Sequence, residues 1–359
     1  MDSKEKYKVI GLMSGTSLDG VDIVCCILRK RDGAWAFGIQ EAQTVQYSAS
    51  WKKKLTGAPT MQGDELLALH SEYGNYLGLL VQAFLVKRKI RGVNFIASHG
   101  HTIFHQPGKR FTFQLGSGMA LHAATDLPVV CDFRSLDVSL RGQGAPLVPA
   151  GDRLLFSEYN ICLNIGGIAN LSTESKGRRI AFDICFANMG LNYLAGERDL
   201  AYDRNGAIAS DGTPDEKLLS ELLDVYGHWR KKRPSLGYEM FVEAIQPVLD
   251  RSKRSVEDKM ATFAESIAIE IAEAIPPSRK KQSMLCTGGG AFNSFLLYRL
   301  MERCGDRVSV IVPEDDIVKF KEAVVFAFLG VLRVRNEVNC LRSVTGAMRD
   351  TSSGTMIGF

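Results

Sequence analysis

The first fifty residues contain three strand-like apolar stretches separated by short polar turns. The stretches span residues 7–14, 20–30 and 34–48, and the turns between them read GTSLDG and RDG. Short turns rich in glycine and aspartate join antiparallel strands. We therefore predict a three-stranded antiparallel meander at the start of the chain.

Helical periodicity follows the meander. Leucines and a phenylalanine recur at helical spacing between residues 64 and 89, which predicts an amphipathic helix. The other elements predicted in the first half are strands at 94–106, 111–116 and 127–133 and a helix at 117–126.

The second half repeats the opening theme. Residues 159–175 read as strand, glycine-rich turn and strand, and residues 178–186 read as a third strand. This is a coarse internal duplication and not a sequence repeat. Further elements predicted here are helices at 188–196, 255–275 and 317–338, a strand, triple-glycine turn and helix within 283–304, and a strand at 308–316. Ser255 and Asp258 stand in a capping-box relation at the start of their helix.

A loop rich in glycine and proline, residues 134–152, separates the two halves. A chain of 359 residues exceeds what one hydrophobic core usually supports. Alternating strands and helices favour an α/β protein with mixed sheets. We therefore predict an N-terminal domain of residues 1–135 plus a tail of about 340–359, and a C-terminal domain of residues 136–339.

Composition is that of an ordinary globular protein, with 45% hydrophobic residues, 23% charged residues and a net charge of +4. Basic runs near residues 29, 87 and 230 are scattered, so we expect solvated surface and no nucleic-acid partner. The eight cysteines form no CxxC pair and lie mostly in apolar stretches, which argues against zinc and disulfides and fits a reducing cytoplasm. The charged N-terminus and the lack of long apolar runs predict neither a secretion signal nor a membrane span.

Three glycine-rich turns each follow an apolar strand, at residues 11–20, 164–170 and 287–293. Without a Cβ atom, backbone N–H groups can approach a phosphate closely. Each turn alone is equally compatible with a tight hairpin. Together they favour a nucleotide held between two domains, although none is a Walker A or a GxGxxG motif.

Asp183 follows the apolar strand beginning at Arg178, where a carboxylate could act as a general base. It could equally cap the next helix. Asp19 could orient its turn or contact a metal-bound phosphate, and Asp22 faces away from the apolar side of its strand.

Half of the six histidines, His99, His101 and His105, lie in SHGHTIFHQP. The HxH pair has no carboxylate or cysteine partner nearby, so hydrogen bonding to a substrate is a better prediction than metal ligation.

Ten sequence blocks together resemble the anhydro-N-acetylmuramic acid kinase family, in that family's order and over nearly the whole chain. They are GLMSGTSLDGVD, ASHGHTIFHQP, FQLGSGMALHAAT, PVVCDFR, GQGAPLVP, LNIGGIANLS, AFD…AN, LCTGGGAFN, VPED and SVTGA. The resemblance implies two ribonuclease-H-like domains, with mixed five-stranded sheets and flanking helices, around an interdomain cleft that binds ATP.

The resemblance also implies the reaction and its residues. Water opens the 1,6-anhydro ring of 1,6-anhydro-N-acetylmuramic acid, and the freed 6-oxygen takes the γ-phosphoryl group of ATP with Mg²⁺. Asp183 matches the catalytic base, and His99, His101, Arg134 and Asn188 match sugar-binding positions. The matching nucleotide-binding residues are Ser14, Gly15, Thr16, Ser17, Leu18, Asp19, Gly20, Val21, Asp22, Gly166, Gly167, Gly288, Gly289 and Gly290. No metal-binding side chains are expected, and the family implies a homodimer.

The sequence departs from the family pattern in two places, a tripeptide after Asp183 and a single residue at 101. After Asp183 the family usually has Thr-Gly-Pro, where this chain has Ile184, Cys185 and Phe186; His101 replaces a usual Gln. We expect the first change to remove polar groups and add bulk near the phosphate, and the second to introduce a charge that changes near neutral pH. The alternatives are a kinase for another amino sugar, an impaired sugar- or nucleotide-binding homologue, and a metal-dependent hydrolase that uses the histidines.

Overall fold

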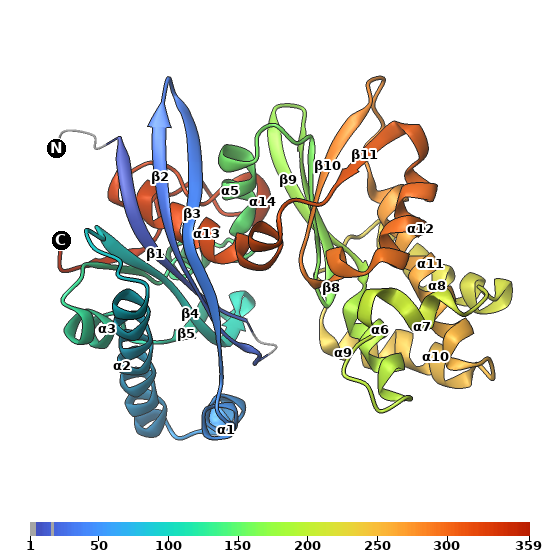
Figure 1. Cartoon of the computed structure of the whole chain (residues 1–359), viewed down its shortest axis with the longest axis horizontal. Coiled ribbons are helices and arrows are strands. Elements are labelled where there is room, and N and C mark those ends of the chain that lie inside the picture. The colour runs from blue at the N-terminus through green and yellow to red at the C-terminus, as the bar shows by residue number, and fades with distance from the viewer. Residues whose placement is uncertain (1–4, 16–17) are drawn as a thin grey trace. The chain divides into compact units, whose positions relative to one another are not determined.

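The computed structural model describes residues 5–15 and 18–359 (Figure 1). Contacts divide the chain into two compact units, Met1–Ser157 with Phe320–Phe359, and Glu158–Lys319. The sequence predicted boundaries at 135 and about 340. In the structure, residues 136–157 and 320–339 instead belong to the first unit. The predicted interdomain cleft stays a prediction.

The first unit is built on a mixed sheet that opens with the predicted meander. Its described strands are β1 (Lys6–Ser14), β2 (Gly20–Arg31), β3 (Ala34–Gln46), β4 (Phe95–Gln106), β5 (Phe111–Leu115), β6 (Val129–Cys131) and β12 (Thr355–Ile357). The order is β12-β6-β4-β1-β2-β3, with β5 paired to β4. Strands β1, β4 and β6 are parallel to one another, whereas β2 pairs antiparallel with both β1 and β3.

Helices cover this sheet. They are α1 (Ala49–Gly57), α2 (Gly63–Lys87), α3 (Gly118–Thr125), α4 (Ser135–Ser139), α5 (Val148–Leu155), α13 (Asp315–Val334, which begins in the second unit) and α14 (Arg342–Thr345). Helix α2 lies beside α3, as Figure 1 shows. The sequence missed α1, which begins where the predicted third strand was expected to end. The Ser48 side chain caps it by accepting a hydrogen bond from the N–H of Trp51.

The second unit repeats the arrangement. Its strands are β7 (Ile161–Ile165), β8 (Ile168–Ser175), β9 (Arg178–Phe186), β10 (Gln282–Thr287) and β11 (Val308–Ile311), in the order β11-β10-β7-β8-β9. This order corresponds to β6-β4-β1-β2-β3 of the first unit. The α/β class with two mixed, ribonuclease-H-like sheets and the internal duplication are therefore confirmed. The second sheet has the expected five strands, whereas the first is enlarged to seven by β5 and β12.

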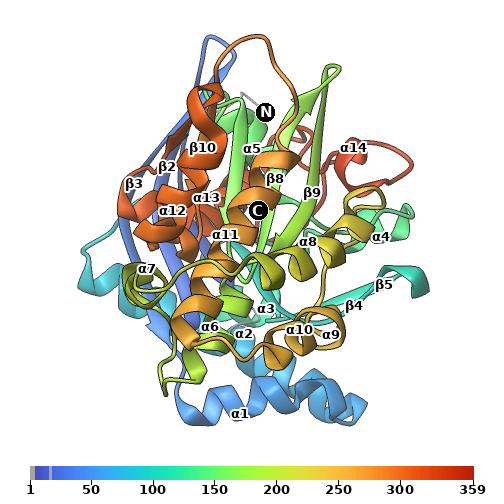
Figure 2. The same cartoon turned by 90° about the vertical axis from the view of Figure 1, so that its right-hand side faces the viewer.

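Helix α11 is the central helix of the second unit (Figure 2). The helices here are α6 (Asn188–Gly196), α7 (Ala207–Ser210), α8 (Glu216–Arg230), α9 (Tyr238–Met240), α10 (Gln246–Arg251), α11 (Val256–Ala274) and α12 (Ser294–Cys304), with a π-helical turn at Phe241–Ile245. Ser255 caps α11 by accepting from the N–H of Asp258, as its sequence predicted. Most residues of α11 are buried, and it contacts β9, α6, α8 and α12.

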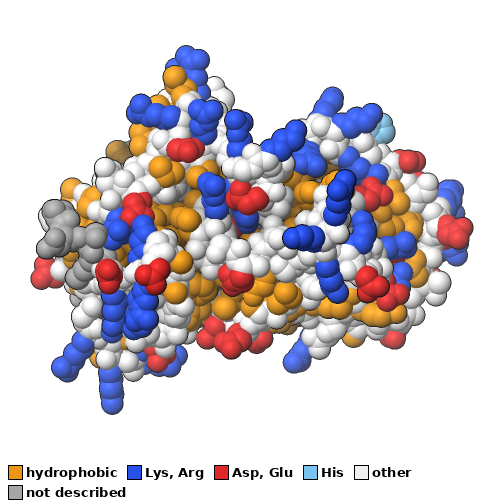
Figure 3. Space-filling model, turned by 90° about the horizontal axis from the view of Figure 1, so that it is seen from above, with side chains coloured by type: hydrophobic (Ala, Val, Ile, Leu, Met, Phe, Trp, Pro, Cys, Tyr) orange, Lys and Arg blue, Asp and Glu red, His pale blue; other side chains and the backbone are white. Residues whose placement is uncertain are grey.

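The surface visible in Figure 3 carries charges of both signs, and the cysteines lie mostly inside the protein. The face in Figure 3 carries lysine and arginine side chains interspersed with acidic and apolar ones. The eight cysteines are free thiols, and all except the half-buried Cys131 are buried. In the described residues, no helix has the length and apolar character needed to cross a bilayer.

Candidate active site

Several residues of the β1–β2 turn have packing roles. A Cβ atom on Gly20 would lie 2.3 Å from the carbonyl oxygen of Val45, so close pairing of β2 with β3 requires glycine there. Val21 is fully buried in the core of the first unit. Leu18 has a positive φ of 59°, and its N–H reaches the carbonyl oxygen of Gly15 at 3.4 Å. Thr16 and Ser17 lie outside the described residues.

Asp22 lies on β2, shortly after this turn. Burial raises its pKa, and the charge of exposed Asp19 adds to that rise. Thr44 donates a 2.6 Å hydrogen bond to Oδ1 of Asp22, which lowers the pKa. Burial also raises the pKa of Glu322, an effect that Lys321 and Arg134 oppose. The negative charges of Asp22 and Asp152 add to the rise in the pKa of Glu322.

The sequence analysis did not identify Glu322. Its signal in the sequence was the adjacent charged pair Lys321 and Glu322 directly before the long apolar stretch of helix α13. Lys321 makes a 2.8 Å ion pair with Asp152, and both side chains are 5% exposed. A paired charge buried on an apolar helix often marks a functional position.

His99 holds Arg134 in place. Its Nδ1 lies 2.9 Å from the carbonyl oxygen of Gly100, which can only accept, so Nδ1 carries the hydrogen. Its Nε2 accepts from Nε of Arg134 at 3.0 Å, and Arg134 also donates to the carbonyl oxygen of Gly144 at 2.7 Å. Burial and Arg134 lower the pKa of His99 to about 3. Both ring nitrogens are therefore engaged within the protein, and His99 offers no lone pair to a metal.

His99 also lines a hollow in the first unit. The other lining residues are His70, Ser98, Gly100, Thr112, Phe113, Gln114, Gly116, Gly118, Cys131, Asp132 and Ser135. Ser98 is 1% exposed, and its Oγ has no hydrogen-bond partner among the described residues. His70 accepts at Nδ1 from the N–H of Gly116, so its Nε2 carries a hydrogen. The hollow thus offers both hydrogen-bond donors and acceptors to a small polar ligand.

His101 does not have the expected charge change near neutral pH. Burial lowers its pKa to about 4, so the ring is neutral at physiological pH. Its Nδ1 lies 2.8 Å from Oγ of Ser14, another residue of the predicted nucleotide turn. The predicted charge change was wrong because His101 is buried, with only 4% of the residue exposed. In the described residues no three His, Cys, Asp or Glu side chains gather as a metal site would require.

In the second unit, the β7–β8 turn contacts the start of α6. The carbonyl oxygen of Gly166 accepts from the N–H of Asn188 at 3.0 Å, and that of Gly167 accepts from the N–H groups of Ala187 and Met189. The Asn188 side chain donates to the carbonyl oxygen of Ile165 at 3.2 Å. These bonds give Gly166 and Gly167 a role in fixing α6.

The three glycines after β10 differ from one another. Cβ atoms on Gly288 and Gly290 would lie 2.6 Å and 2.2 Å from atoms of β7 residues Asn164 and Ile165, so close packing requires both glycines. A Cβ atom on exposed Gly289 would meet only Nδ2 of Asn188, at 3.4 Å. Gly289 is therefore the glycine of this turn whose open side can accept a ligand.

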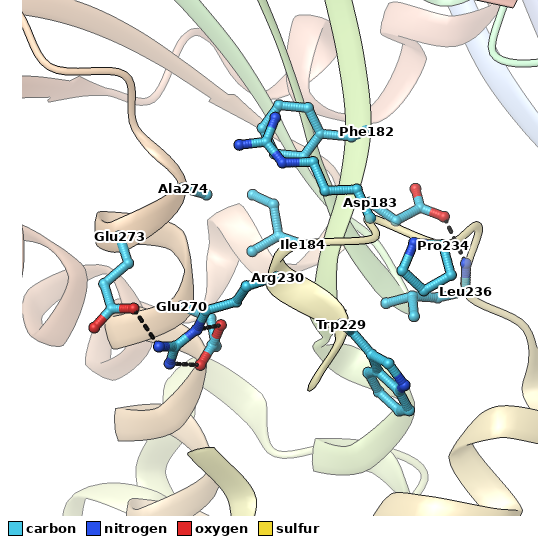
Figure 4. A pocket seen from close by; sticks show the side chains of 11 residues that line it. Phe182, Asp183, Ile184, Trp229, Arg230, Pro234, Leu236, Glu270, Glu273 and Ala274 are labelled. Carbon is cyan, nitrogen blue, oxygen red and sulfur yellow. Dashed lines mark hydrogen bonds and ion pairs between the residues drawn. The ribbon is translucent and has the colours of Figure 1, made fainter. Parts of the chain in front are cut away.

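Asp183 lies within β9 and lines a hollow of the second unit (Figure 4). Its partner in β8 is Asn170, whereas Cys185 pairs with Ala169, so Ile184 is the extra residue of a β-bulge. Bulges redirect side chains and are common beside active sites. Helix α6 has Ala187 at its N-cap position, so Asp183 does not cap it.

A backbone amide holds the Asp183 carboxylate. The N–H of Leu236 donates to Oδ2 of Asp183 at 3.0 Å. Burial raises the pKa of Asp183, and this hydrogen bond opposes the rise. Figure 4 shows Asp183 and Leu236 on one side of the hollow and Arg230, ion-paired to Glu270 and Glu273, on the other. A carboxylate with a raised pKa beside an open hollow can accept a proton from water.

The expected bulk near the phosphate is not found. Cys185 and Phe186 are fully buried in the core of the second unit, where Phe186 packs edge-on against Trp229 and Phe241. Of the three residues after Asp183 that depart from the family pattern, only Ile184 lines the hollow.

The duplicated fold, its glycine-rich turns and the half-buried carboxylate define a kinase-type α/β enzyme. The sequence profile of the family described as anhydro-N-acetylmuramic acid kinase matches residues 7–358. The chain belongs to this family, and the family predicted from the sequence is confirmed.

Curated relatives of that name match almost end to end. One from Sulfurovum sp. (strain NBC37-1) is 33% identical, with 98% of this chain and 99% of the relative covered. One from Sulfurimonas denitrificans is 32% identical, with 97% and 98% covered. A solved activator of 2-hydroxyisocaproyl-CoA dehydratase from Clostridium difficile is 15% identical with a TM-score of 0.45, covering 92% of this chain and 97% of its own.

Proposed function

We propose that this chain hydrolytically opens the 1,6-anhydro ring of 1,6-anhydro-N-acetylmuramic acid and phosphorylates its 6-oxygen, giving N-acetylmuramic acid 6-phosphate and ADP. The observation that carries the proposal is the half-buried Asp183 carboxylate at a β-bulge, held by the N–H of Leu236 beside an open hollow. Family membership supplies the substrate class.

Asp183 takes the proton from a water molecule in the first step. The water oxygen bonds to the anomeric carbon, and the bond between that carbon and the 6-oxygen breaks. The 6-oxygen keeps the electron pair and attacks the γ-phosphorus of ATP, so the bond from that phosphorus to the β–γ bridging oxygen breaks and ADP leaves. Asp183 then releases its proton to solvent. Because a raised pKa makes a stronger base, burial of Asp183 favours the first step.

Gly289 supports nucleotide binding. It is exposed, and its missing Cβ leaves space beside Asn188, whereas packing accounts for Gly288 and Gly290. We assign Gly289 and the β1–β2 turn, with Ser14 at its start, to backbone contacts with the nucleotide. Phosphoryl transfer depends mainly on positioning and charge neutralisation, which such contacts provide.

Mg²⁺ fits the carboxylates of the first unit. Asp22 and Glu322 offer oxygen ligands, which Mg²⁺ prefers, and the charge of Asp22 helps to raise the pKa of Glu322. Bound with ATP, the ion would neutralise charge on the phosphates. We propose that these two residues hold it through few direct contacts, since Mg²⁺ keeps water and phosphate ligands.

The hollow beside His99 suits the sugar. Its lining combines the Asp132 carboxylate, the Gln114 amide and the Ser98 hydroxyl, groups that hydrogen-bond to hydroxyl and amide substituents. Arg134, fixed by His99, keeps guanidinium hydrogens to donate to an anionic substituent. We propose that Arg134 contacts the sugar's carboxylate and that His99 acts through Arg134.

We also propose that the two compact units are the two domains, that the enzyme acts in the cytoplasm as a homodimer, and that it serves peptidoglycan recycling. These assignments rest on the family and on the absence of a membrane-spanning helix in the described residues. Light scattering coupled to size-exclusion chromatography tests the dimer.

Turnover in water enriched in heavy oxygen tests the reaction. We expect one heavy oxygen on the anomeric carbon of the product and none in its phosphate. Authentic product incubated in the same water for the same time corrects for exchange. Product without excess anomeric label, or turnover only with a non-anhydro amino sugar, would overturn the proposal. Sugar binding without any phosphorylated product would identify a non-catalytic homologue.

A further inference from the structure

Asp137 is completely buried in the first unit, where its carboxylate joins two segments that are far apart in the sequence. Its Oδ2 accepts from the backbone N–H of Gly144 at 2.8 Å. Its Oδ1 accepts from the Thr345 hydroxyl at 2.8 Å and from the Cys340 thiol at 3.0 Å. Burying a carboxylate is costly unless hydrogen bonds satisfy it. The loop that contains Gly144 and the C-terminal tail are therefore both tied to this one side chain.

The GQG sequence of this loop fits around the carboxylate. A Cβ atom on Gly142 would lie 2.0 Å from Oδ2 of Asp137, so the carboxylate occupies space that glycine leaves open. Gly144 has a positive φ of 67°, which glycine adopts readily. The N–H of Gly142 donates to the carbonyl oxygen of Asp137, and that of Gln143 donates to the carbonyl oxygen of Thr345, both at 2.8 Å. The loop is thus built onto Asp137 and the tail.

Gly144 in turn holds the guanidinium group of Arg134. The Gly144 carbonyl oxygen accepts from Nη1 of Arg134 at 2.7 Å. Nε2 of His99 accepts from Nε of Arg134 at 3.0 Å and lies 2.9 Å from Nη2. Two anchors on different edges of the guanidinium fix its orientation, whereas the His99 contact alone would leave it free to pivot. Because the N–H and the C=O of Gly144 flank one Cα atom, the bond from this N–H to Asp137 also fixes the carbonyl that holds Arg134.

We propose that Asp137 is a positioning residue that orients the Arg134 guanidinium through Gly144, and that this orientation sets the preference of the site for a sugar that carries a carboxylate. Asp137 is completely buried and acts through Gly144, without contact to the sugar. Hydrogen bonds from a guanidinium to a carboxylate are charge-assisted and directional, so their strength depends on this orientation. The preference rests on the proposed function, in which Arg134 contacts the carboxylate of the sugar, whereas the positioning of Arg134 does not.

Calorimetry with two sugars tests the preference. The sugars are 1,6-anhydro-N-acetylmuramic acid and 1,6-anhydro-N-acetylglucosamine, which lacks the carboxylate. We expect Asp137→Ala to reduce the preference for the first sugar by roughly tenfold, the scale of one hydrogen bond to a charged group. Gly142→Ala should act in the same direction, because its Cβ atom displaces Oδ2 of Asp137, and it carries the test if Asp137→Ala does not fold. An equal loss of affinity for both sugars would reveal a purely structural role and overturn the proposal.

Asp137→Asn and Thr345→Val are the matched controls. The asparagine oxygen can still accept from Gly144, while its amide group faces the Thr345 hydroxyl and the Cys340 sulfur, which can both accept. Thr345→Val removes a donor to Oδ1 and leaves the bond from Gly144 to Oδ2. Both variants should keep the native preference, even where urea titrations show a lower free energy of unfolding. A tenfold drop in preference in either control would contradict the link through Gly144.

Nitrogen-15 NMR of the ligand-free protein, labelled at histidine, separates the positioning from the proposed function. Nε2 of His99 accepts from Arg134, so its chemical shift reports the placement of the guanidinium. The His99 signals are identified by their absence in His99→Gln. We expect Asp137→Ala and Gly142→Ala to move the Nε2 shift toward that of an acceptor nitrogen without a donor, and Thr345→Val to leave it unchanged. An unchanged shift in the first two variants would remove Asp137 from this role. Native protein without a sugar preference would contradict the contact between Arg134 and the substrate and leave the positioning to be judged by the spectra.

Discussion

The backbone N–H of Leu236 donates to the Asp183 carboxylate at 3.0 Å, across 53 residues of sequence. A main-chain donor cannot be protonated or rotated away, so it fixes one carboxylate oxygen while the other stays available. It also offsets part of the pKa rise that burial causes. Asp183 is thereby held in place, and the hydrogen bond favours its ionised form.

Asp183→Asn removes the proposed base and keeps the size of the side chain. General-base catalysis contributes roughly 10²–10⁴-fold, so we expect turnover to fall by about that factor while ATP affinity changes by no more than about threefold. Coupled ADP release and calorimetry with ATP measure the two quantities. Asp250→Asn is the control, because Asp250 is exposed in the same unit and, among the described residues, accepts a hydrogen bond from Tyr193 alone. An equal loss of turnover in both variants would mean that the asparagine side chain disturbs the fold and that Asp183 is not the base.

The pH profile reports the Asp183 environment. Activity needs the ionised carboxylate, so it is lost as pH falls through the pKa of Asp183. Because burial raises that pKa, we expect the acid limb of kcat/KM to lie above the ordinary value of 3.8. The limb should be absent from the residual activity of Asp183→Asn. An unshifted limb that persists in this variant would assign the ionisation to another group.

His101 links stability to pH. Its pKa is lowered from 6.5 to about 4, so the unfolded chain binds a proton more readily than the native protein between these values. The stabilisation is complete above pH 6.5 and is lost as pH falls toward 4. We expect the free energy of unfolding to drop by about 2 kcal/mol more in the native sequence than in His101→Gln between pH 7 and pH 4.5. Urea titrations at both pH values measure the difference, and parallel losses would contradict it.

Strong local patterns made much of the fold predictable. Strand β9 and helix α6 begin and end where expected, at 178–186 and 188–196, with only Ala187 between them. Helix α1 was missed because its residues, ASWKKKLTG, form no apolar stripe. It is held by the Ser48 cap and by packing of Trp51 against Tyr76, whose ring centroids lie 4.5 Å apart.

Sequence motifs single out Asp183 and the glycine-rich turns as candidate site residues, and those assignments stay predictions. The Leu236 contact could not be predicted, because a backbone donor leaves no side-chain signature. Sequence also could not separate Gly289 from Gly288 and Gly290, since three-dimensional packing against β7 distinguishes them. The burial of Phe186 was misjudged for the same reason: the bulge at Ile184 determines which side chains enter the core.

Substitutions at the neighbouring glycines Gly289 and Gly290 should affect different properties, ATP affinity in one case and stability in the other. Gly290→Ala forces a Cβ atom against Ile165, so we expect a loss of about 1–3 kcal/mol in unfolding free energy. Gly289→Ala meets only Asn188, so stability should stay within about 0.5 kcal/mol of the native value. Its affinity for ATP should fall roughly tenfold, about 1.4 kcal/mol, if the nucleotide approaches this backbone. Denaturation and calorimetry on both variants decide the assignment, and unchanged ATP affinity in Gly289→Ala would remove Gly289 from the site.

Restoring the usual family residue should destabilise the protein strongly at position 186 and hardly at all at position 184. Phe186→Pro removes a fully buried ring and a strand N–H, so we expect a loss of about 3–5 kcal/mol of stability. Ile184→Thr changes a half-buried side chain of the hollow, so stability should change by less than about 1 kcal/mol. The new hydroxyl partly solvates Asp183, which lowers its pKa and moves the acid limb of kcat/KM to lower pH. Melting curves and pH–rate profiles of the two variants test this contrast, and an unmoved limb in a stable Ile184→Thr protein would show that Ile184 does not shield the carboxylate.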